Sequence, residues 1–552
     1  MKGFPLQRRG KSLKSRTFAY ELTITLSKMV KRILLSVAAL CLTSTLSAQY
    51  AWQEGATPGK WQPGKDINYK VEMQGSLSDG TTPLWLNANK YGLSSLDEKN
   101  GYLRLQAIRP LSNDSARRWG LGYGVDVVAA HHYTSHVVVQ QAFAELRWLH
   151  GTLTVGSKEW PMELKNNQLS SGSQTLGINA RPVPQVRIAL PQYWTLPFAN
   201  RWLHIKGHIA YGRLTDENWQ HDFTNKQSKY ADDVLYHSKS GYLMIGNPDR
   251  FCPWSVELGL EMATIFGGTA YHPYGNGQVN AIHNGTGIKD FLRAFVPGGA
   301  DTPEIGSDYQ NEEGDILGSW VARVNYETDS WKIGVYADKY FEDHSSMLQL
   351  DYDGYGSGEE WNVKKRHHYF LYDFKDWMLG AELNLRNGTW LRDFVFEYLY
   401  TKYQSGPLYH DHTIGRPEHI CGADNFYNHY IYPGWQHWGQ VMGNPLYRSP
   451  IYNTDGTLTI EDNRFTAFHL GFDGQPTDAL SYRVLASWQE GLGTYTRPYT
   501  KKRHNVSFMV EAQYALPSQW NIKAAYGMDF GSILGHNKGA QITISKSGLF
   551  SL

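Results

Sequence analysis

The feature that most constrains this chain is an alternation of apolar residues with polar residues or glycine that recurs along its length. A two-residue period over about ten residues gives a β-strand one apolar and one polar face, as in membrane-spanning barrels. On this pattern Ala524 faces lipid and Ala525 faces the interior. The apolar positions of the clearest two segments are Val506, Phe508, Val510, Ala512, Tyr514, Trp520, Ile522, Ala524, Tyr526 and Met528.

A soluble β-sandwich alternates in the same way, so the connections between segments decide the architecture. Short turns and long connections both occur, and long loops on one side with short turns on the other are typical of outer-membrane barrels. We therefore predict an all-β fold, a transmembrane antiparallel β-barrel of the bacterial outer membrane. The short turns fall at 150–151, 327–330, 386–388, 475–478 and 517–519, and the long connections at 160–200, 266–315, 340–375 and 404–463.

The two ends of the chain agree with export to that membrane. Lys31 and Arg32 precede an apolar run at 33–42 and small residues up to Ala48, which is the pattern of a secretory signal peptide. At the other end, Ile542, Ile544, Gly548 and Phe550 share one face of a final strand, although a soluble edge strand is the alternative. We predict a mis-assigned start extension at 1–28, a signal peptide at 29–48, a periplasmic lead-in at 49–79 and a single barrel at 80–552.

Charge and cysteine content narrow the possible partners. The first 48 residues hold nine of the 53 Lys and Arg and one of the 52 Asp and Glu, so the remaining chain has 44 basic and 51 acidic residues. Its net charge of −7 argues against a nucleic-acid partner. Only Cys252 and Cys421 follow Ala48, and nothing in the sequence determines whether they form a disulfide.

One long connection contains an unusually aromatic segment, Asp424–Pro450. It follows neither a strand nor a helix period, and its prolines exclude a helix. It is either an ordered loop whose rings pack together, or a loop that lines a wet cavity and presents rings and amides to a sugar-like ligand. The candidate glycan-binding or lumen-lining residues here are Asn428, His429, Tyr430, Trp435, Trp438 and Asn444.

A second irregular segment runs from Asn179 to Gln185. Pro182 and Pro184 cannot lie inside a barrel ladder, and irregular backbone at membrane depth must line the lumen or pack under other protein. The segment is either a structural latch that closes the pore or a contact for an anionic sugar. Its candidates are Asn179, Arg181, Gln185 and Arg187, with Arg181 and Arg187 facing water or acidic wall residues such as Glu257 and Glu261.

Candidate chemistry elsewhere is weak. His410 and His412 share a strand face, but no third metal ligand stands at a readable spacing. Acid pairs such as Glu359–Glu360 and Glu342–Asp343 are common in loops of this composition, and no nucleophile elbow or nucleotide-binding motif occurs. We therefore predict no catalytic residues, no metal, no cofactor and no enzyme activity.

Several motifs in order along the chain resemble the Wzi family of capsule-assembly outer-membrane barrels. They are Asn425, Tyr427, Asn428, His429, Gly434, Trp435, Gly439 and 443–446, together with 82–92 (read as the family's first strand region), 169–172 and 179–186. The resemblance implies about 18 strands, a lumen plugged by inward loops and a non-enzymatic role in attaching capsular polysaccharide. It also implies surface polysaccharide, outer-membrane lipid with lipopolysaccharide, and the barrel-insertion machinery as partners. A porin or saccharide channel, and a barrel enzyme, are the rival functions.

Overall fold

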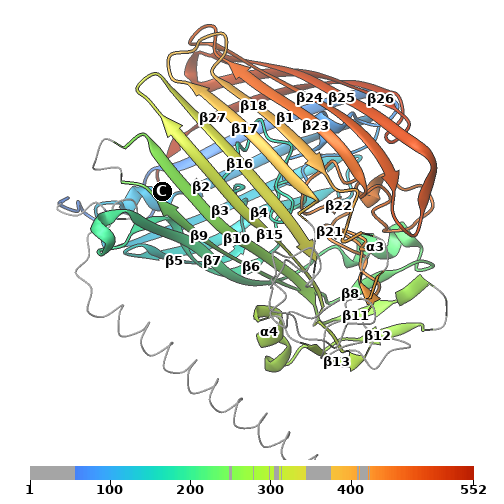
Figure 1. The fold of residues 1–552 in the computed structure, drawn as a ribbon. Coiled ribbons are helices and arrows are strands. Elements are labelled where there is room, and N and C mark those ends of the chain that lie inside the picture. The colour runs from blue at the N-terminus through green and yellow to red at the C-terminus, as the bar shows by residue number, and fades with distance from the viewer. Residues whose placement is uncertain are drawn as a thin grey trace, which may run out of the picture. The chain divides into compact units, whose positions relative to one another are not determined.

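An antiparallel sheet of 18 strands forms the wall of the molecule (Figure 1). The computed structural model describes residues 52, 56–247, 252–275, 277, 279–296, 299–303, 310–312, 314–342, 374–406, 409–410, 420–421 and 423–552. The wall strands are β1 (Ile67–Asp79), β2 (Lys99–Arg109), β3 (Trp119–His131), β4 (Val137–Trp148), β5 (Gly151–Ser157), β6 (Gln185–Thr195), β7 (Leu203–Arg213), β9 (Leu235–Ile245), β10 (Trp254–Phe266), β15 (Asp315–Glu327), β16 (Trp331–Glu342), β17 (Trp377–Leu385), β18 (Asp393–Tyr400), β23 (Phe465–Gly474), β24 (Leu480–Gly493), β25 (Pro498–Leu516), β26 (Trp520–Gly531) and β27 (Asn537–Phe550).

The sheet closes on itself because its first strand pairs with both its second and its last. Gly75 of β1 lies opposite Gly101 of β2 on one side and opposite Ile542 of β27 on the other. A closed sheet leaves no row of unpaired backbone groups, which is a requirement for crossing a bilayer with strands. The predicted barrel of about 18 strands is confirmed.

The two faces of the wall follow the predicted alternation. On β26, Ile522 and Tyr526 are 40% and 43% exposed on the outer surface, whereas Ala525 is 8% exposed. Inward-facing polar side chains such as Asp529 and Gln541 are buried. The outer surface is therefore the apolar belt that lipid covers, and the polar face surrounds the lumen.

The start of the barrel differs from the prediction. A periplasmic lead-in was expected to occupy 49–79, but β1 begins at Ile67. Gly75 interrupts the apolar face of β1, which leaves Val71, Met73 and Leu77 as a weak signal. The predicted start extension and signal peptide lie outside the described residues.

The segment expected to be the first strand region, 82–92, is not a wall strand. It turns into the lumen and forms the short helix α2 (Leu84–Asn87), whose four residues are all buried. The Leu84 N–H donates to the Asp529 carboxylate of β26, with its two oxygens 3.1 and 3.3 Å away. A buried carboxylate on the inner wall therefore anchors this segment.

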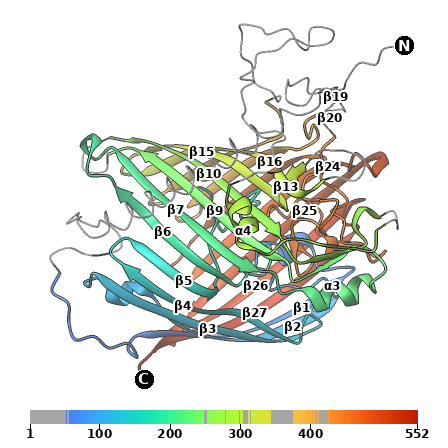
Figure 2. The same ribbon diagram turned by 90° about the horizontal axis from the view of Figure 1, so that it is seen from below.

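Every long connection begins and ends at the same rim, and the strands at the opposite rim are joined by short connections only (Figure 2). The predicted short turns all join strands at the rim that also holds the end of β27. The predicted long connection at 160–200 is shorter in the structure, because β6 occupies Gln185–Thr195. The bilayer orientation follows from this asymmetry, with the long connections extracellular.

Smaller elements decorate the rims and the lumen. No helix among the described residues is long and apolar enough to cross a membrane. Cys252 is a free thiol, and the side chain of Cys421 lies outside the described residues. The elements are η1 (Leu111–Asp114), η2 (Ala199–Arg201), α3 (Glu217–Thr224), β8 (Tyr230–Asp232), β11 (Thr269–Tyr271), η3 (Pro273–Gly275), β12 (Ala281–His283), α4 (Ile288–Phe295), β13 (Gly299–Pro303), β14 (Gln310–Glu312), β19 (Tyr409–His410), β20 (Ile420–Cys421), β21 (Gln436–His437), β22 (Gln440–Val441), η5 (Pro450–Tyr452) and η6 (Pro517–Gln519).

Candidate functional site in the plugged lumen

Three connections from the extracellular rim fold back into the lumen, and we call them together the plug. They are residues 80–98, 158–184 and 423–463. Several of their large apolar side chains, including Trp85, Trp435 and Tyr447, have 2% or less of their surface exposed. The predicted plugging of the lumen by inward loops is confirmed.

Tyr427 is at the centre of the plug. Its hydroxyl donates to the backbone oxygen of Gln174 and accepts a 3.0 Å hydrogen bond from the N–H of Asn444. Its ring stacks on that of Tyr447 with 4.1 Å between ring centroids. Burial raises the pKa of Tyr427 well above its usual value, so this hydroxyl stays protonated and keeps donating. One side chain thus joins two segments of the plug.

The plug is also bonded to the inner wall by buried carboxylates. Glu397 of β18 accepts from the Ser170 hydroxyl at 2.5 Å and from the Ser171 N–H at 2.8 Å. Lys165 pairs with Asp338 of β16 at 2.7 Å, and both side chains are almost fully buried. Removing one partner of such a pair leaves an uncompensated buried charge, which destabilises strongly. The plug is therefore fixed to the wall.

Three of the predicted glycan-binding residues use their side-chain amides in hydrogen bonds within the plug. Asn444 donates to Ser171 and Gly172, and its oxygen accepts from the Leu446 N–H. Asn179 bonds Val441 and Asn89, and Asn428 bonds both backbone groups of Ile460. Asn179 and Asn444 are buried, so for these two amides the structure favours the structural interpretation, whereas Asn428 is half-buried. The second irregular segment is likewise buried in the lumen, as its prolines predicted.

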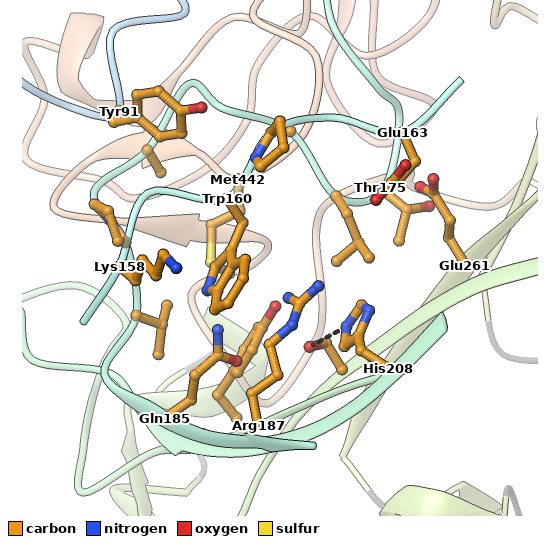
Figure 3. Close-up of a pocket in the computed structure, with 18 of the residues that line it drawn as sticks. Tyr91, Lys158, Trp160, Glu163, Thr175, Gln185, Arg187, His208, Glu261 and Met442 are labelled. Atoms are coloured by element: carbon orange, nitrogen blue, oxygen red, sulfur yellow. Dashed lines mark hydrogen bonds between the residues drawn. The ribbon is translucent and has the colours of Figure 1, made fainter. Parts of the chain in front are cut away.

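A cavity of about 90 Å³ remains between the plug and strands β6, β7, β9 and β10 (Figure 3). Four predicted candidates line it: Arg181, Gln185, Arg187 and Trp435. Sequence reasoning missed Trp160, His208 and Tyr242, which lie on separate strands and a loop and carry no local signal. Only closure of the barrel brings these residues together.

The two arginines of the cavity are held by aromatic rings. The Arg187 guanidinium lies 4.0 Å from the ring centroid of Trp160. The Arg181 guanidinium lies 4.1 Å from the ring centroid of Trp438. Burial lowers the pKa of Arg181 to about 10, which leaves it charged at neutral pH. Cation–π contacts of this kind orient a guanidinium without neutralising it. Neither arginine is ion-paired with a carboxylate among the described residues.

The predicted acidic partners of these arginines behave differently from each other. Glu261 lines the same cavity as Arg187, but it accepts hydrogen bonds from Tyr242 at 2.8 Å and from Ser173 at 3.2 Å. Glu257 does not line the cavity and instead bonds Tyr193 and Asn325. The expectation for Glu257 is therefore wrong, because Tyr193 and Asn325 already occupy its carboxylate.

The remaining candidates lie near the extracellular surface of the plug. His429 is half-buried, and its Nδ1 accepts from the N–H groups of Ile431 and Tyr432 at 3.2 Å each. Burial lowers the pKa of His429 to about 3, so it is a neutral acceptor. Tyr430 is 41% exposed, and Trp438 is partly exposed. These two rings are the candidates that a ligand outside the cell can reach.

The weaker motifs give no metal site in the part of the chain that is described. No group of three or more His, Cys, Asp and Glu is placed to hold a metal there. Glu342 is buried and accepts from the Tyr340 hydroxyl at 2.6 Å and from the Tyr427 N–H. His412, Asp343 and the pair Glu359–Glu360 lie outside the described residues.

Comparison with known proteins places the fold. A scan with family models found no match, and a search of curated proteins found none. Among solved structures, the chain is similar to Wzi of Escherichia coli, with a TM-score of 0.53 and 11% sequence identity. The match covers 89% of this chain and 85% of Wzi. Wzi is an outer-membrane protein involved in group 1 capsule assembly and is described as a carbohydrate-binding β-barrel. It is less similar to OprD of Pseudomonas aeruginosa (TM-score 0.42, 9% identity, 92% and 99% covered) and OccAB2 of Acinetobacter baumannii (0.44, 9%, 90% and 100%).

At such low identity the likeness to Wzi is a likeness of fold. The fold is that of an outer-membrane barrel. Together with the closed wall and the apolar outer surface, it locates the chain in the bacterial outer membrane.

Proposed function

We propose that this barrel is a non-enzymatic protein that binds polysaccharide at the cell surface and helps to attach or assemble a capsule. The observation that carries the proposal is a lumen filled by a hydrogen-bonded plug, with aromatic rings left accessible on its extracellular side. A filled lumen suits a protein that works at its outer surface. The described carbohydrate binding of Wzi, which shares the fold, supports the same reading.

The rival proposal is a porin or saccharide channel, and the plug argues against it. A diffusion channel needs a continuous water-filled path, whereas here Tyr427, Trp435 and Tyr447 are fully buried in the lumen. Opening such a path would break several buried hydrogen bonds, and each costs ~1–3 kcal/mol when a partner is left unsatisfied. A closed barrel is therefore the simpler account.

The size of the inner cavity directs the proposed glycan contact to the surface. Pockets for drug-sized ligands measure about 300–1,000 Å³, and this cavity measures about 90 Å³. It has room for a few water molecules and too little for a sugar chain. The accessible rings of Tyr430 and Trp438 suit the C–H faces of pyranoses, and Tyr274 lies 5.8 Å from Tyr430 between ring centroids.

The proposal is tested with purified barrel in lipid nanodiscs and polysaccharide prepared from the surface of the same strain. The double variant Tyr430→Ala/Trp438→Ala should bind at least about tenfold more weakly, because each ring contact contributes ~0.5–1.5 kcal/mol beyond its buried area. Trp390→Ala is the matched control, since Trp390 is 73% exposed in the short connection between β17 and β18 at the opposite rim.

Equal polysaccharide binding by the double variant and the control would show that these two rings do not contact the glycan. A barrel that binds no polysaccharide and conducts ions in planar bilayers would favour the porin alternative.

A further inference from the structure

The helix α4 lies on the outside of the barrel wall, next to β9 and β10 (Figures 1 and 2). Glu261 of β10 and Tyr236 and Ser238 of β9 line the inner cavity, so the alternate positions of both strands face outward. Phe266 and His237 are such outward positions. Both are fully buried although they face away from the lumen. Something outside the wall therefore covers them, and α4 does so.

The contacts of α4 with the outer wall are specific. The Phe291 ring packs against Phe266 and against Tyr211 of β7, each with 5.2 Å between ring centroids. The Tyr211 hydroxyl donates to the Phe291 backbone oxygen at 2.8 Å. Lys239, on the outer face of β9, donates to the backbone oxygen of Phe295. The Phe295 ring also packs against His237, with 5.7 Å between ring centroids, so two rings of the helix bind it to the wall.

The same helix carries apolar residues that the wall does not cover. Ile288 and Leu292 are 83% and 60% exposed, and Val296, directly after the helix, is 59% exposed. At ~100° per residue, Ile288 and Leu292 lie on the helix surface beside Phe291 and Phe295, in one stripe ~100° wide. Phe291 and Phe295 therefore pack on the wall and are half-buried there, whereas Ile288 and Leu292 are left exposed beside them.

The height of α4 on the wall places that exposed half at the membrane surface. Strand β10 has 13 residues, which at ~3.3 Å per residue and a tilt of ~40° raises its upper end ~30 Å above its lower end. The apolar band of such barrels is ~25 Å tall. Trp254, which is 55% exposed, stands at the lower end of β10, and α4 covers Phe266 at the upper end. The helix is thus at the outer edge of the band.

We propose that α4 is an interfacial helix whose exposed residues Ile288, Leu292 and Val296 insert among the acyl chains of the outer leaflet beside β9 and β10. The apolar belt of the wall lies below the helix on β10, where Leu258 is 46% exposed. Its basic residues, Lys289 and Arg293, suit the anionic headgroups of the leaflet. The helix would anchor the connection between β10 and β15 to the membrane surface and fix the height of the extracellular loops above it.

The test uses residues 49–552 with both of their cysteines replaced, Cys252→Ser/Cys421→Ser, and one fluorescent label at Leu292→Cys, in vesicles that contain spin-labelled lipid. Quenching should be stronger with lipids labelled near the glycerol than with lipids labelled near the chain end, because interfacial helices lie ~5–10 Å deep. Lys289→Cys, which lies outside the apolar stripe and ~60° around the helix from Leu292, is the matched control and should be quenched less. Leu258→Cys, in the apolar belt, should be quenched more by the deep label.

Each labelled barrel is first checked for heat-modifiable migration, which reports a folded wall. A label at Leu292 that neither lipid quenches, in vesicles where Leu258 is quenched, would overturn the proposal. Energy transfer between labels on different copies, together with absence of quenching, would assign the stripe to a second copy of the chain and overturn it equally.

Discussion

The wall and the plug are built by different physics, although the same chain forms both. The wall is held by a regular ladder between neighbouring strands, so a local alternation of side chains is enough to specify it. The plug is held by side chains that bond partners far away in sequence, as Tyr427 bonds Gln174 and as Ser170 bonds Glu397. The comparison shows that local sequence patterning predicts the strands of a barrel, whereas the structure of the plug depends on individual contacts between residues far apart in sequence. The following predictions test that division from the largest expected effect to the smallest.

The largest effect should be a pH dependence confined to the plug. Burial raises the pKa of Asp462 to about 7, while Gln489 and the Gly493 N–H donate to its carboxylate at 3.1 Å each. The folded state therefore holds this proton between about pH 4 and pH 7, where the unfolded state has lost it. The stabilisation is complete at low pH and is lost as pH rises through about 7, by up to about 4 kcal/mol.

Hydrogen exchange of the plug amides should accordingly be slower at pH 5 than at pH 8, after correction for intrinsic exchange rates. Asp462→Asn should reduce the pH dependence of the plug amides around residue 462 and, apart from Gly493, leave the exchange of wall amides unchanged. A pH dependence that is equally strong in Asp462→Asn would assign it to another group.

The next effect concerns the wall. Ala524→Arg places a charge on the lipid-facing side of β26 and should destabilise the barrel by ~2–4 kcal/mol if the position lies near mid-bilayer. Gln513→Arg, on the inward face of the neighbouring strand, is the control and should cost little. Ala525 is a poorer control than its inward parity suggests, because it is buried in the same apolar cluster as Leu86 of the plug. Unfolding in urea from lipid vesicles measures both variants, and equal losses would contradict the assigned faces.

A smaller effect is expected inside the plug. Tyr427→Phe leaves the Gln174 oxygen and the Asn444 N–H without their partner, which should cost ~1–3 kcal/mol of local stability. Tyr430→Phe changes a side chain of the same segment that is 41% exposed, and it should cost less local stability than Tyr427→Phe. Hydrogen-exchange rates of the plug amides distinguish the two variants. Comparable rates in both would show that the Tyr427 hydroxyl does not hold the two plug segments together.

The smallest effect is expected for the ring that covers Arg181. Trp438→Leu removes the cation–π contact while keeping an apolar side chain, and it should cost ~0.5–1 kcal/mol. The loss should appear as faster exchange of the Arg181 backbone amide. Trp390→Leu, at the opposite rim, should leave that amide unchanged.

The sequence predicts the wall well and the site only in part, for reasons that particular residues illustrate. Ala524 and Ile522 show their face by alternation alone, and Pro182 and Pro184 mark a segment that a ladder cannot hold. β1 was missed because Gly75 interrupts its apolar face. From the sequence, the amides of Asn179 and Asn444 are candidates for binding a ligand. Their actual partners, the backbone oxygens of Val441 and Gly172, become neighbours only when the barrel closes. Trp160 and His208 were missed for the same reason.

The central claim is that the plug closes a wall that would otherwise be open, and single-channel conductance tests it most directly. The intact protein in planar bilayers should give no conductance steps. Replacement of 426–444 by a short Gly/Ser linker removes Tyr427, Trp435 and Asn444, and should give discrete steps while the wall keeps its heat-modifiable migration, since the ladder does not involve this segment. Stable porin-like steps from the intact protein, or a folded linker variant that stays closed, would contradict the claim.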